Sequence, residues 1–365
     1  MEEIHDLTDN EKELLTLLGK FPDISVKELS THISYQWAST VSKTLKKLKE
    51  LHIMGGPMYD VDFGKLSRNP THWLFCIIES AMSHEAVLSY LRLIEPLRWV
   101  YPVLSPHKNV LNVGYISSDD DEVKALLRLL KNNNIITDFI VRTHSHERIV
   151  ENPNFSGEVN PSLDNLLDPC ELPDLSCGHH DTNWNECDIA VLPYLETGYK
   201  ETKLIEIMKA EKKRGNNWTY EQLKYSREKM VRNNLIKKRF TILPFSPLQC
   251  AVFMLFVKTD DTLLTRRILH NFARGAQVYK HYVLCGDWGQ ISCTSHPHFL
   301  TNLMHNLDKT KEITRKELYP LRSVVIDIPA RIPTELRYFD IDKQTLVYPY
   351  PEFEKKIKEK LENEQ

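Results

Sequence analysis

A duplication constrains the fold of this chain more than any other feature of its sequence. Residues 7–150, and again residues 184–326, run through a helical, basic segment and then through the order strand, helix, strand, strand, helix, strand. A period this long exceeds that of solenoid repeats and indicates duplication of a whole pair of domains. The repeated unit is predicted to be a compact helical domain followed by an α+β module.

The first helical segment is predicted to contain three helices. Two capping boxes, Thr8-x-x-Glu11 and Ser25-x-x-Glu28, start the first and the second helix. Apolar residues recur at three- and four-residue spacing over 37–52, which predicts the third helix. Three helices of this size with a tight turn between the last two match helix-turn-helix geometry.

The third helix is the candidate DNA-reading helix. A glycine pair ends it, and residues 54–66 are expected to add a small β wing, as in a winged helix-turn-helix domain. Polar side chains off its apolar stripe are placed to reach phosphates or base edges. These residues are Ser39, Thr40, Ser42, Lys43, Lys46 and Lys47. The alternative is that the lysines form an ordinary solvated helix face.

The second helical segment is more basic than the first. Between Lys203 and Arg239 there are 12 Lys or Arg residues and 4 Glu residues, a net charge of about +8 that favours a polyanionic partner. A further capping box, Thr219-x-x-Gln222, starts the last helix of this segment. The candidate DNA contacts on this helix are Lys224, Arg227, Lys229 and Arg232. The alternative is that such basic runs only complement the dipole at a helix end.

Each helical segment is followed by a module with the order βαββαβ. The elements expected in the first module are 72–81, 83–93, 97–104, 110–116, 119–132 and 135–143, and those in the second are 249–258, 262–272, 277–286, 290–294, 297–307 and 318–326. This order is the ferredoxin-like split βαβ, an α+β fold in which both helices cover one face of an antiparallel sheet. Because strand 72–81 is apolar on both sides, the two modules are expected to pack sheet against sheet.

This combination of domains resembles the Lrp/AsnC (feast/famine) family of transcription regulators. The likeness covers residues 7–150 and, less closely, 184–326. The stretches Leu7-Thr8-x-x-Glu11, 25–30 and 39–43 resemble the DNA-reading helices of the family. Gly286-Asp287-Trp288 lies between two predicted strands, where the family carries a Gly-Asp-aromatic turn beside its small-molecule pocket.

The resemblance implies a transcription regulator that binds double-stranded DNA. It also implies an amino-acid-like effector near Gly286 and Asp287. Family members bind DNA as dimers or higher assemblies, so this chain would be an intramolecular pseudo-dimer and possible homodimer. Three departures stand against a complete match. Family chains usually hold one copy of the unit, and the second helical unit here is longer, with no close match to the first two helices of the family. The first module has Lys108-Asn109-Val110 where the Gly-Asp turn is expected.

A second resemblance keeps the architecture and changes the function. Tetrapyrrole decarboxylases that act on siroheme are similar to this regulator family in both domains and also occur as fused halves, with histidine and arginine near the module interface that assist proton transfer. This chain offers Arg68, His72, Arg98 and His107 in the first half and His281, His296 and His298 in the second. None lies in a run that matches those enzymes. The chain is therefore expected not to be an enzyme and to need no cofactor.

The domain boundaries follow from the same patterns. The expected segments are a winged helix-turn-helix over 1–68, a module over 69–150, a linker over 151–183, a second helical domain over 184–245, a second module over 246–328 and a C-terminal extension over 329–365. A short hairpin over 338–348 and a charged helix over 352–365 are expected in the extension.

No metal site is predicted in the linker. Cys170, Cys177, His179, His180 and Cys187 are the right residue types for zinc, but they lack the C-x-x-C spacing of paired ligands. The odd number of cysteines, seven, indicates reduced thiols rather than a disulfide framework. No run is long and apolar enough to span a membrane and no signal-peptide pattern is present, so a cytoplasmic location is expected.

Overall fold

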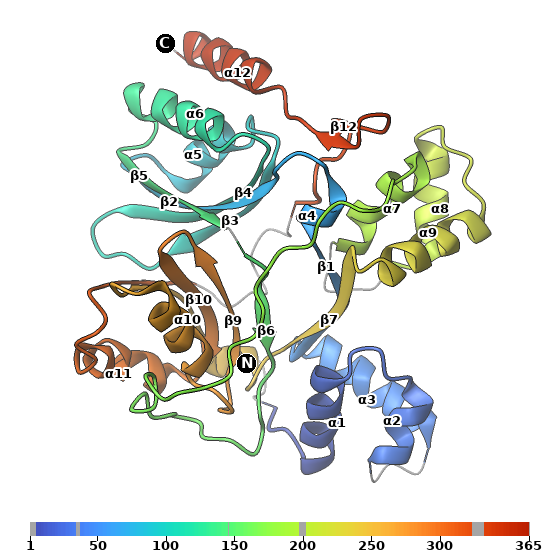
Figure 1. The fold of residues 1–365 in the computed structure, drawn as a ribbon, viewed down its shortest axis with the longest axis vertical. Coiled ribbons are helices and arrows are strands. Elements are labelled where there is room, and N and C mark those ends of the chain that lie inside the picture. Colours follow the sequence, from blue (N-terminus) through green and yellow to red (C-terminus); the bar gives the residue numbers. More distant parts are fainter. Residues whose placement is uncertain (1–4, 34–36, 145, 197–201, 323–331, 365) are drawn as a thin grey trace. The chain divides into compact units, whose positions relative to one another are not determined.

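The computed structural model describes residues 5–33, 37–144, 146–196, 202–322 and 332–364. The chain forms two compact units, and each is built from segments that are distant in the sequence (Figure 1). Unit 1 contains Met1–Met58, His146–Leu175 and Lys238–Asp327; unit 2 contains Tyr59–Ser145, Ser176–Lys237 and Ile328–Gln365. Each unit therefore combines the α+β module of one half of the duplication with the helical segment of the other half.

The three helices predicted in the first segment are confirmed. They are α1 (Asp9–Lys20), α2 (Val26–His32) and α3 (Ala38–Glu50). Both capping boxes form, because the Thr8 and Ser25 hydroxyls accept hydrogen bonds from the backbone N–H of Glu11 and Glu28 at 3.3 and 3.2 Å. The apolar stripes meet in a buried cluster that includes Leu14, Leu15, Leu18, Leu29, Val41 and Leu48.

The β wing of the first helical domain is made by two distant segments. Strand β1 (Met54–Val61) lies where the wing is predicted. Its hydrogen-bonded neighbour is β7 (Ile236–Ile242), which follows the second helical segment. A short helix, α4 (Phe63–Leu66), comes after β1 and is capped by Asp62.

The first module, in unit 2, has the predicted ferredoxin-like topology. Its elements are β2 (His72–Ser80), α5 (His84–Leu91), β3 (Leu97–Val103), β4 (Asn109–Ser117), α6 (Asp120–Asn132) and β5 (Asp138–His144). The strands pair antiparallel in the order β3-β4-β2-β5. Strand β5 begins three residues later than predicted, because Asn134 adopts a positive φ of 60° after α6 and Ile135 and Ile136 pack into the core.

The second module, in unit 1, repeats this topology. Its elements are β8 (Ala251–Lys258), α10 (Thr262–Asn271), β9 (Tyr279–Cys285), β10 (Trp288–Ser295), α11 (Pro297–Asp308) and β11 (Arg315–Pro320). A fifth strand that was not predicted, β6 (Ile149–Glu151), extends the order to β11-β8-β10-β9-β6. Residues 323–326 of the predicted last strand lie outside the described residues.

The segment expected to be a linker is packed onto the second module. Leu163, Leu166 and Leu175 belong to the buried cluster of this module, although they show no helical or strand periodicity. The side-chain amide of Asn271 donates to the carbonyls of Leu166 at 3.2 Å and Asp168 at 2.9 Å. Residues 151–175 of this segment are part of unit 1, and residues 176–183 belong to unit 2.

The C-terminal extension packs onto the first module in a similar way. It contains a small hairpin, β12 (Phe339–Asp340) with β13 (Thr345–Leu346), and a terminal helix, α12 (Tyr350–Asn363), close to the predicted positions. Tyr350 and Phe353 are buried in the cluster of unit 2. The Tyr350 hydroxyl accepts hydrogen bonds from the backbone N–H of Ser118 and Asp119, which immediately precede α6.

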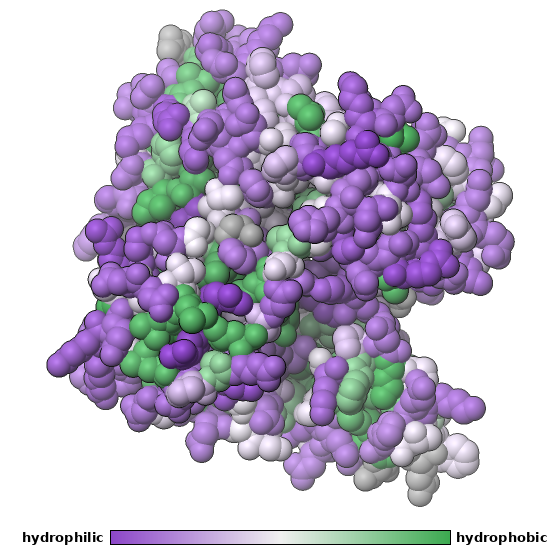
Figure 2. All heavy atoms as spheres, viewed as in Figure 1, coloured by the Kyte–Doolittle hydropathy of each residue, from purple (hydrophilic) through white to green (hydrophobic). Residues whose placement is uncertain are grey.

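The second helical segment, in unit 2, contains α7 (Glu186–Glu196), α8 (Leu204–Lys213) and α9 (Tyr220–Arg232). The predicted capping box of Thr219 and Gln222 starts α9. Figure 2 shows mostly hydrophilic side chains over α8 and α9, in agreement with the basic composition of this segment. No described helix has the length and apolar character needed to cross a membrane.

Candidate nucleic-acid interface and a histidine–carboxylate pair

Helix α3 presents a polar face that is largely exposed. Ser39, Ser42, Lys43, Lys46 and Lys47 are exposed and Thr40 is half-buried, whereas Val41 and Leu48 turn into the core. At 100° per residue, Ser39, Lys43 and Lys46 follow one another along the centre of the exposed face. The only acidic residue of the helix, Glu50, lies at its C-terminal end. The N-terminal turns of α3 therefore offer hydroxyls and ammonium groups alone.

Two of these lysines have carboxylate partners. Lys46 Nζ lies 3.6 Å from Glu50 Oε1, one turn further along an exposed surface. Lys47 Nζ lies 3.2 Å from Glu11 Oε1, and the Glu11 side chain is only 5% exposed. Burial acts to raise the pKa of Glu11, but hydrogen bonds from Thr8 and Lys47 and the charges of His5 and Lys47 bring it below its ordinary value. Lys47 is thus held by an ionised, nearly buried carboxylate.

Helix α9 carries the second predicted set of cations in a less uniform setting. Lys224 and Arg232 are exposed and Arg227 is half-buried. Two exposed acidic residues, Glu221 and Glu228, lie three residues before and four residues after Lys224 on the same face. The basic surface of α9 is therefore interrupted by negative charge.

Lys229, the fourth cation of this set, points into the fold. Its Nζ lies 2.6 Å from Asp188 Oδ2 and donates to the Asn183 carbonyl at 2.8 Å. The Asp188 side chain is 1% exposed and the lysine side chain 15% exposed. Lys229 is therefore not proposed as a DNA contact, because Asp188 neutralises its charge inside unit 2.

The Gly286-Asp287 pair forms a tight turn between β9 and β10. The flanking residues Cys285 and Trp288 pair with each other, and Gly286 has a positive φ of 64°, which favours glycine in such turns. Asp287 forms an ion pair with Lys258 at the end of β8. In the first module Lys108 forms the corresponding ion pair with Glu79, with the charges reversed. A role of Gly286 and Asp287 in effector binding stays a prediction.

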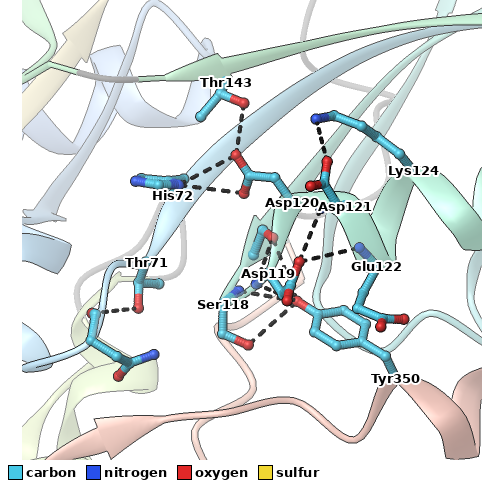
Figure 3. A network of polar contacts seen from close by, with 12 residues as sticks. Thr71, His72, Ser118, Asp119, Asp120, Asp121, Glu122, Lys124, Thr143 and Tyr350 are labelled. Carbon is cyan, nitrogen blue, oxygen red and sulfur yellow. Dashed lines mark hydrogen bonds and ion pairs between the residues drawn. The ribbon is translucent and has the colours of Figure 1, made fainter.

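A histidine–carboxylate pair lies at one end of the first module (Figure 3). His72 begins β2, and its Nδ1 lies 3.3 Å from Oδ2 of Asp120, the first residue of α6. The Thr143 hydroxyl donates to the same carboxylate at 2.8 Å. The hydrogen bond with Asp120 raises the pKa of His72, although burial opposes the shift. The imidazole remains 40% exposed, so it can exchange a proton with a bound molecule.

The pKa of Asp120 moves in the opposite direction. Burial acts to raise it, but the hydrogen bonds from His72 and Thr143 and the charge of His72 bring it below its ordinary value. The two shifts agree in sign, because each partner stabilises the charged form of the other. His72 is among the histidines expected from the sequence, but Asp120 is not, because its only signal is its place in the acidic first turn of α6.

The other histidine and arginine candidates occupy varied settings. Arg98 is buried and lies 2.6 Å from Glu196, while Arg68 donates to the side chain of Asn183. His296 and His298 stack at the start of α11, where the His296 ring accepts from the His298 backbone. His107 is exposed and His281 is half-buried on β9. Within the described ranges no group of three or more His, Cys, Asp or Glu side chains is arranged to hold a metal ion.

Comparisons with known proteins describe the fold rather than a family. No protein-family model and no curated protein sequence matches the chain. Among solved structures, the siroheme decarboxylase NirDL is 12% identical, with a TM-score of 0.48, over 96% of this chain and 98% of its own. Its complex with an iron-uroporphyrin III analogue is similar over 98% of this chain and all of its own, at 11% identity and a TM-score of 0.48.

A structure of the leucine response regulatory protein LrpA of Mycobacterium tuberculosis is similar over part of the chain. It is 14% identical with a TM-score of 0.29, and the match covers 38% of this chain and 91% of that protein. The match to NirDL thus covers nearly the whole chain, whereas the match to this regulator covers part of it. The expectation that the chain is not an enzyme is contradicted, because a solved structure that matches over 96% of this chain is that of a siroheme decarboxylase.

Proposed function

We propose that this chain binds double-stranded DNA through the exposed face of α3 and regulates transcription. The observation that carries the proposal is the row formed by Ser39, Lys43 and Lys46, which is exposed apart from the single ion pair at its C-terminal end. An ordinary solvated helix balances lysine with glutamate at three- and four-residue spacing. The first two turns of α3 contain no such glutamate, as expected for a helix that lies against phosphates and base edges.

Helix α9 has a smaller part in this proposal. Lys224, Arg227 and Arg232 are available for phosphate contacts, but Glu221 and Glu228 would repel the backbone of DNA. The second helical domain would therefore add sequence-independent affinity, and α3 would supply base readout.

A salt titration of DNA binding tests the proposal. Binding of the full chain to genomic duplex fragments is followed by fluorescence anisotropy between about 50 and 200 mM salt. Each lost phosphate contact lowers the slope of log K against log salt by about 0.9. The double variant Lys43→Ala, Lys46→Ala should therefore lose about two units of slope and bind all fragments more weakly.

The matched control removes two exposed lysines from α12, Lys355→Ala and Lys358→Ala, whose side chains are 77% and 55% exposed. This variant should keep the slope of the unmodified protein. An unchanged slope in the α3 variant would remove α3 from the interface.

An amino-acid-like effector belongs to the same proposal. The turn at Gly286 and Asp287 occupies the place at which the Lrp/AsnC resemblance implies a ligand. Each of the common amino acids is added to the DNA titration at a saturating concentration. A shift in DNA affinity that Asp287→Asn abolishes supports the effector site, and no shift with any amino acid argues against it.

A second candidate is decarboxylation of a tetrapyrrole side chain, favoured by the His72–Asp120 pair. Loss of CO2 from a carboxylate leaves an electron pair on the adjacent carbon, which must take up a proton. The His72 imidazolium, stabilised by Asp120 and partly exposed, is a suitable proton donor. NirDL, which has a similar architecture, is described as a siroheme decarboxylase.

This second candidate is tested by incubating the full chain with siroheme without oxygen and measuring CO2 and the decarboxylated tetrapyrrole. His72→Asn should lower the rate at least about 100-fold if His72 is the acid. His107→Asn, at an exposed histidine of the same module, should leave the rate unchanged. If the unmodified protein releases no CO2 above the buffer control, the candidate is withdrawn.

A further inference from the structure

The same ion pair occurs in both halves of the duplication. In the first helical domain Lys47 of α3 contacts Glu11 of α1 at 3.2 Å. In the second, Lys229 of α9 contacts Asp188 of α7 at 2.6 Å. Both lysines stand three residues before the last residue of their helix, and each is followed by a buried apolar residue, Leu48 or Met230. We call this pair the acid–lysine brace.

The acid of each brace holds the same structural position. Glu11 is the third residue of α1 and closes the capping box of Thr8, whose backbone N–H donates to it at 2.9 Å. Asp188 is the third residue of α7, and it exchanges hydrogen bonds with Asn185 at 2.9 and 3.0 Å. Each carboxylate therefore caps the first helix with one set of contacts and binds the third helix with another.

The chemistry is retained although the residues differ. The capping residue is Thr8 in one half and Asn185 in the other, and the acid is glutamate in one half and aspartate in the other. Both carboxylates are buried, at 5% and 1% exposure of the side chain. A buried carboxylate without a cation is strongly destabilising, so the lysine is required where it stands.

We propose that Glu11 and Asp188 are positioning residues that fix the third helix of each helical domain against the first. In this arrangement Lys47 and Lys229 serve as counter-ions to these carboxylates and do not contact phosphate. The proposal deepens the DNA-binding function and rests on it for α3. It assigns different roles to two adjacent lysines of that helix. Lys46 contacts the DNA, whereas Lys47 fixes the angle between α3 and α1.

The two helical domains differ in how firmly the brace is held. Glu11 has a second side chain within hydrogen-bond reach, because His5 Nε2 lies 3.1 Å from its Oε2. Asp188 pairs with Lys229, whose ammonium also lies 5.0 Å from the centre of the Trp184 ring. Removal of the lysine should therefore disturb the second domain more than the first.

The experiment compares Lys47→Met with Lys46→Met in the full chain. Lys46→Met should lower the salt slope of DNA binding by about 0.9, as loss of one phosphate contact does. Lys47→Met should leave the slope unchanged and weaken binding to a preferred fragment about fivefold relative to a random duplex, since a reading helix that is out of place loses base contacts. Lys47→Arg, which keeps the cation, should restore the preference. A slope change in Lys47→Met equal to that in Lys46→Met would overturn the proposal.

A second measurement does not depend on DNA and separates failure of the brace from failure of the proposed function. Midpoints of thermal unfolding are measured for Asp188→Asn, Lys229→Met and the double variant, and for the corresponding Glu11→Gln and Lys47→Met series. The double variants should lose less than the sum of the single losses, because the second substitution removes a charge that the first left unpaired. Lys224→Met, at an exposed lysine of α9, should leave the midpoint unchanged. If the decreases in unfolding midpoint are additive in both series, the acid–lysine brace is refuted, even where DNA binding is established.

Discussion

The indole ring of Trp99 on β3 lies directly against Gly114 on β4. A Cβ atom at Gly114 would come within 2.2 Å of two ring atoms, far inside van der Waals contact. The rings of Trp73 and Phe75 flank the same indole at centroid distances of 5.2 and 5.4 Å. These aromatic side chains lie on the sheet face opposite the helices. The Trp99 ring fills the space that a side chain at position 114 would occupy, so glycine is required there.

Replacing this glycine should destabilise the first module. Gly114→Ala forces the Trp99 ring to move, and we expect a loss of about 1–3 kcal/mol in the free energy of unfolding. The matched variant in the second module is Gly289→Ala, where a Cβ would meet methyl groups of Leu269 and Thr265 at the longer distances of 2.7 and 2.9 Å. Urea unfolding should show a smaller loss there, and equal losses would contradict the steric explanation.

The His72–Asp120 pair should make the stability of unit 2 depend on pH. Because the pKa of His72 is raised on folding, its stabilisation is fully present below its ordinary pKa of 6.5 and is lost as the pH rises through the folded-state value. His72→Gln should therefore cost more stability at pH 6 than at pH 8, as measured by urea unfolding. The Asp120 contribution has the opposite sign, since its lowered pKa gives stability that is lost only in acid, below about pH 3.9. A variant with the same loss at both pH values would refute the pairing.

Glu95 should be the main polar anchor of the C-terminal extension. It accepts hydrogen bonds from the Tyr338 hydroxyl and from Lys356 Nζ, both at 2.7 Å, and it also pairs with Arg337. Glu95→Gln keeps the size of the side chain and removes the charge, which should cost about 1–3 kcal/mol. Limited proteolysis of α12 should accelerate in this variant. Glu85→Gln, at an acidic residue in the first turn of α5, is the control and should not change the rate of cleavage.

Lys280 should be indispensable for attaching β6 to the second module. Its side chain is fully buried, and its Nζ contacts Glu151 of β6 at 3.2 Å and the His270 carbonyl at 3.1 Å. Lys280→Met leaves Glu151 without its cation, and we expect a loss of about 3–5 kcal/mol in chemical unfolding. Adding Glu151→Gln should recover part of that loss. If the double variant is less stable than Lys280→Met alone, the ion pair is not the reason for the buried lysine.

Local structure was largely predictable from the sequence. The capping boxes at Thr8, Ser25 and Thr219 are formed by residues within three positions of each other, so a short pattern contains all the information. The strands and helices of both modules were found for the same reason, through the two-residue and 3.6-residue spacing of their apolar side chains. Strand β6 was missed because three residues are too few to show a period.

The candidate site was only partly predictable. Exposed lysines of α3 were identified because they lie off the apolar stripe. The ion pair of Lys229 could not be predicted in this way, because this half-buried lysine lies at the edge of the apolar stripe of α9. Its partner, Asp188, is 41 positions away in the sequence. The sequence does contain one indication. Lys47 and Lys229 occupy equivalent positions when the sequences of the two halves are aligned, and an acidic residue is the third residue of the first helix in both halves.

The composition of the two units has a consequence for synthesis of the protein. Unit 1 needs residues from Met1–Met58 and from Lys238–Asp327, so its first helices emerge from the ribosome well before the sheet with which they share a unit. At roughly 5–20 residues per second the delay is on the order of 10–50 s. During that interval α1 to α3 must persist as an incomplete domain, and the capping boxes at Thr8 and Ser25 are interactions that they can form alone. Capping interactions within α1 and α2 therefore suit helices whose unit is completed only when residues 238–327 have been synthesised.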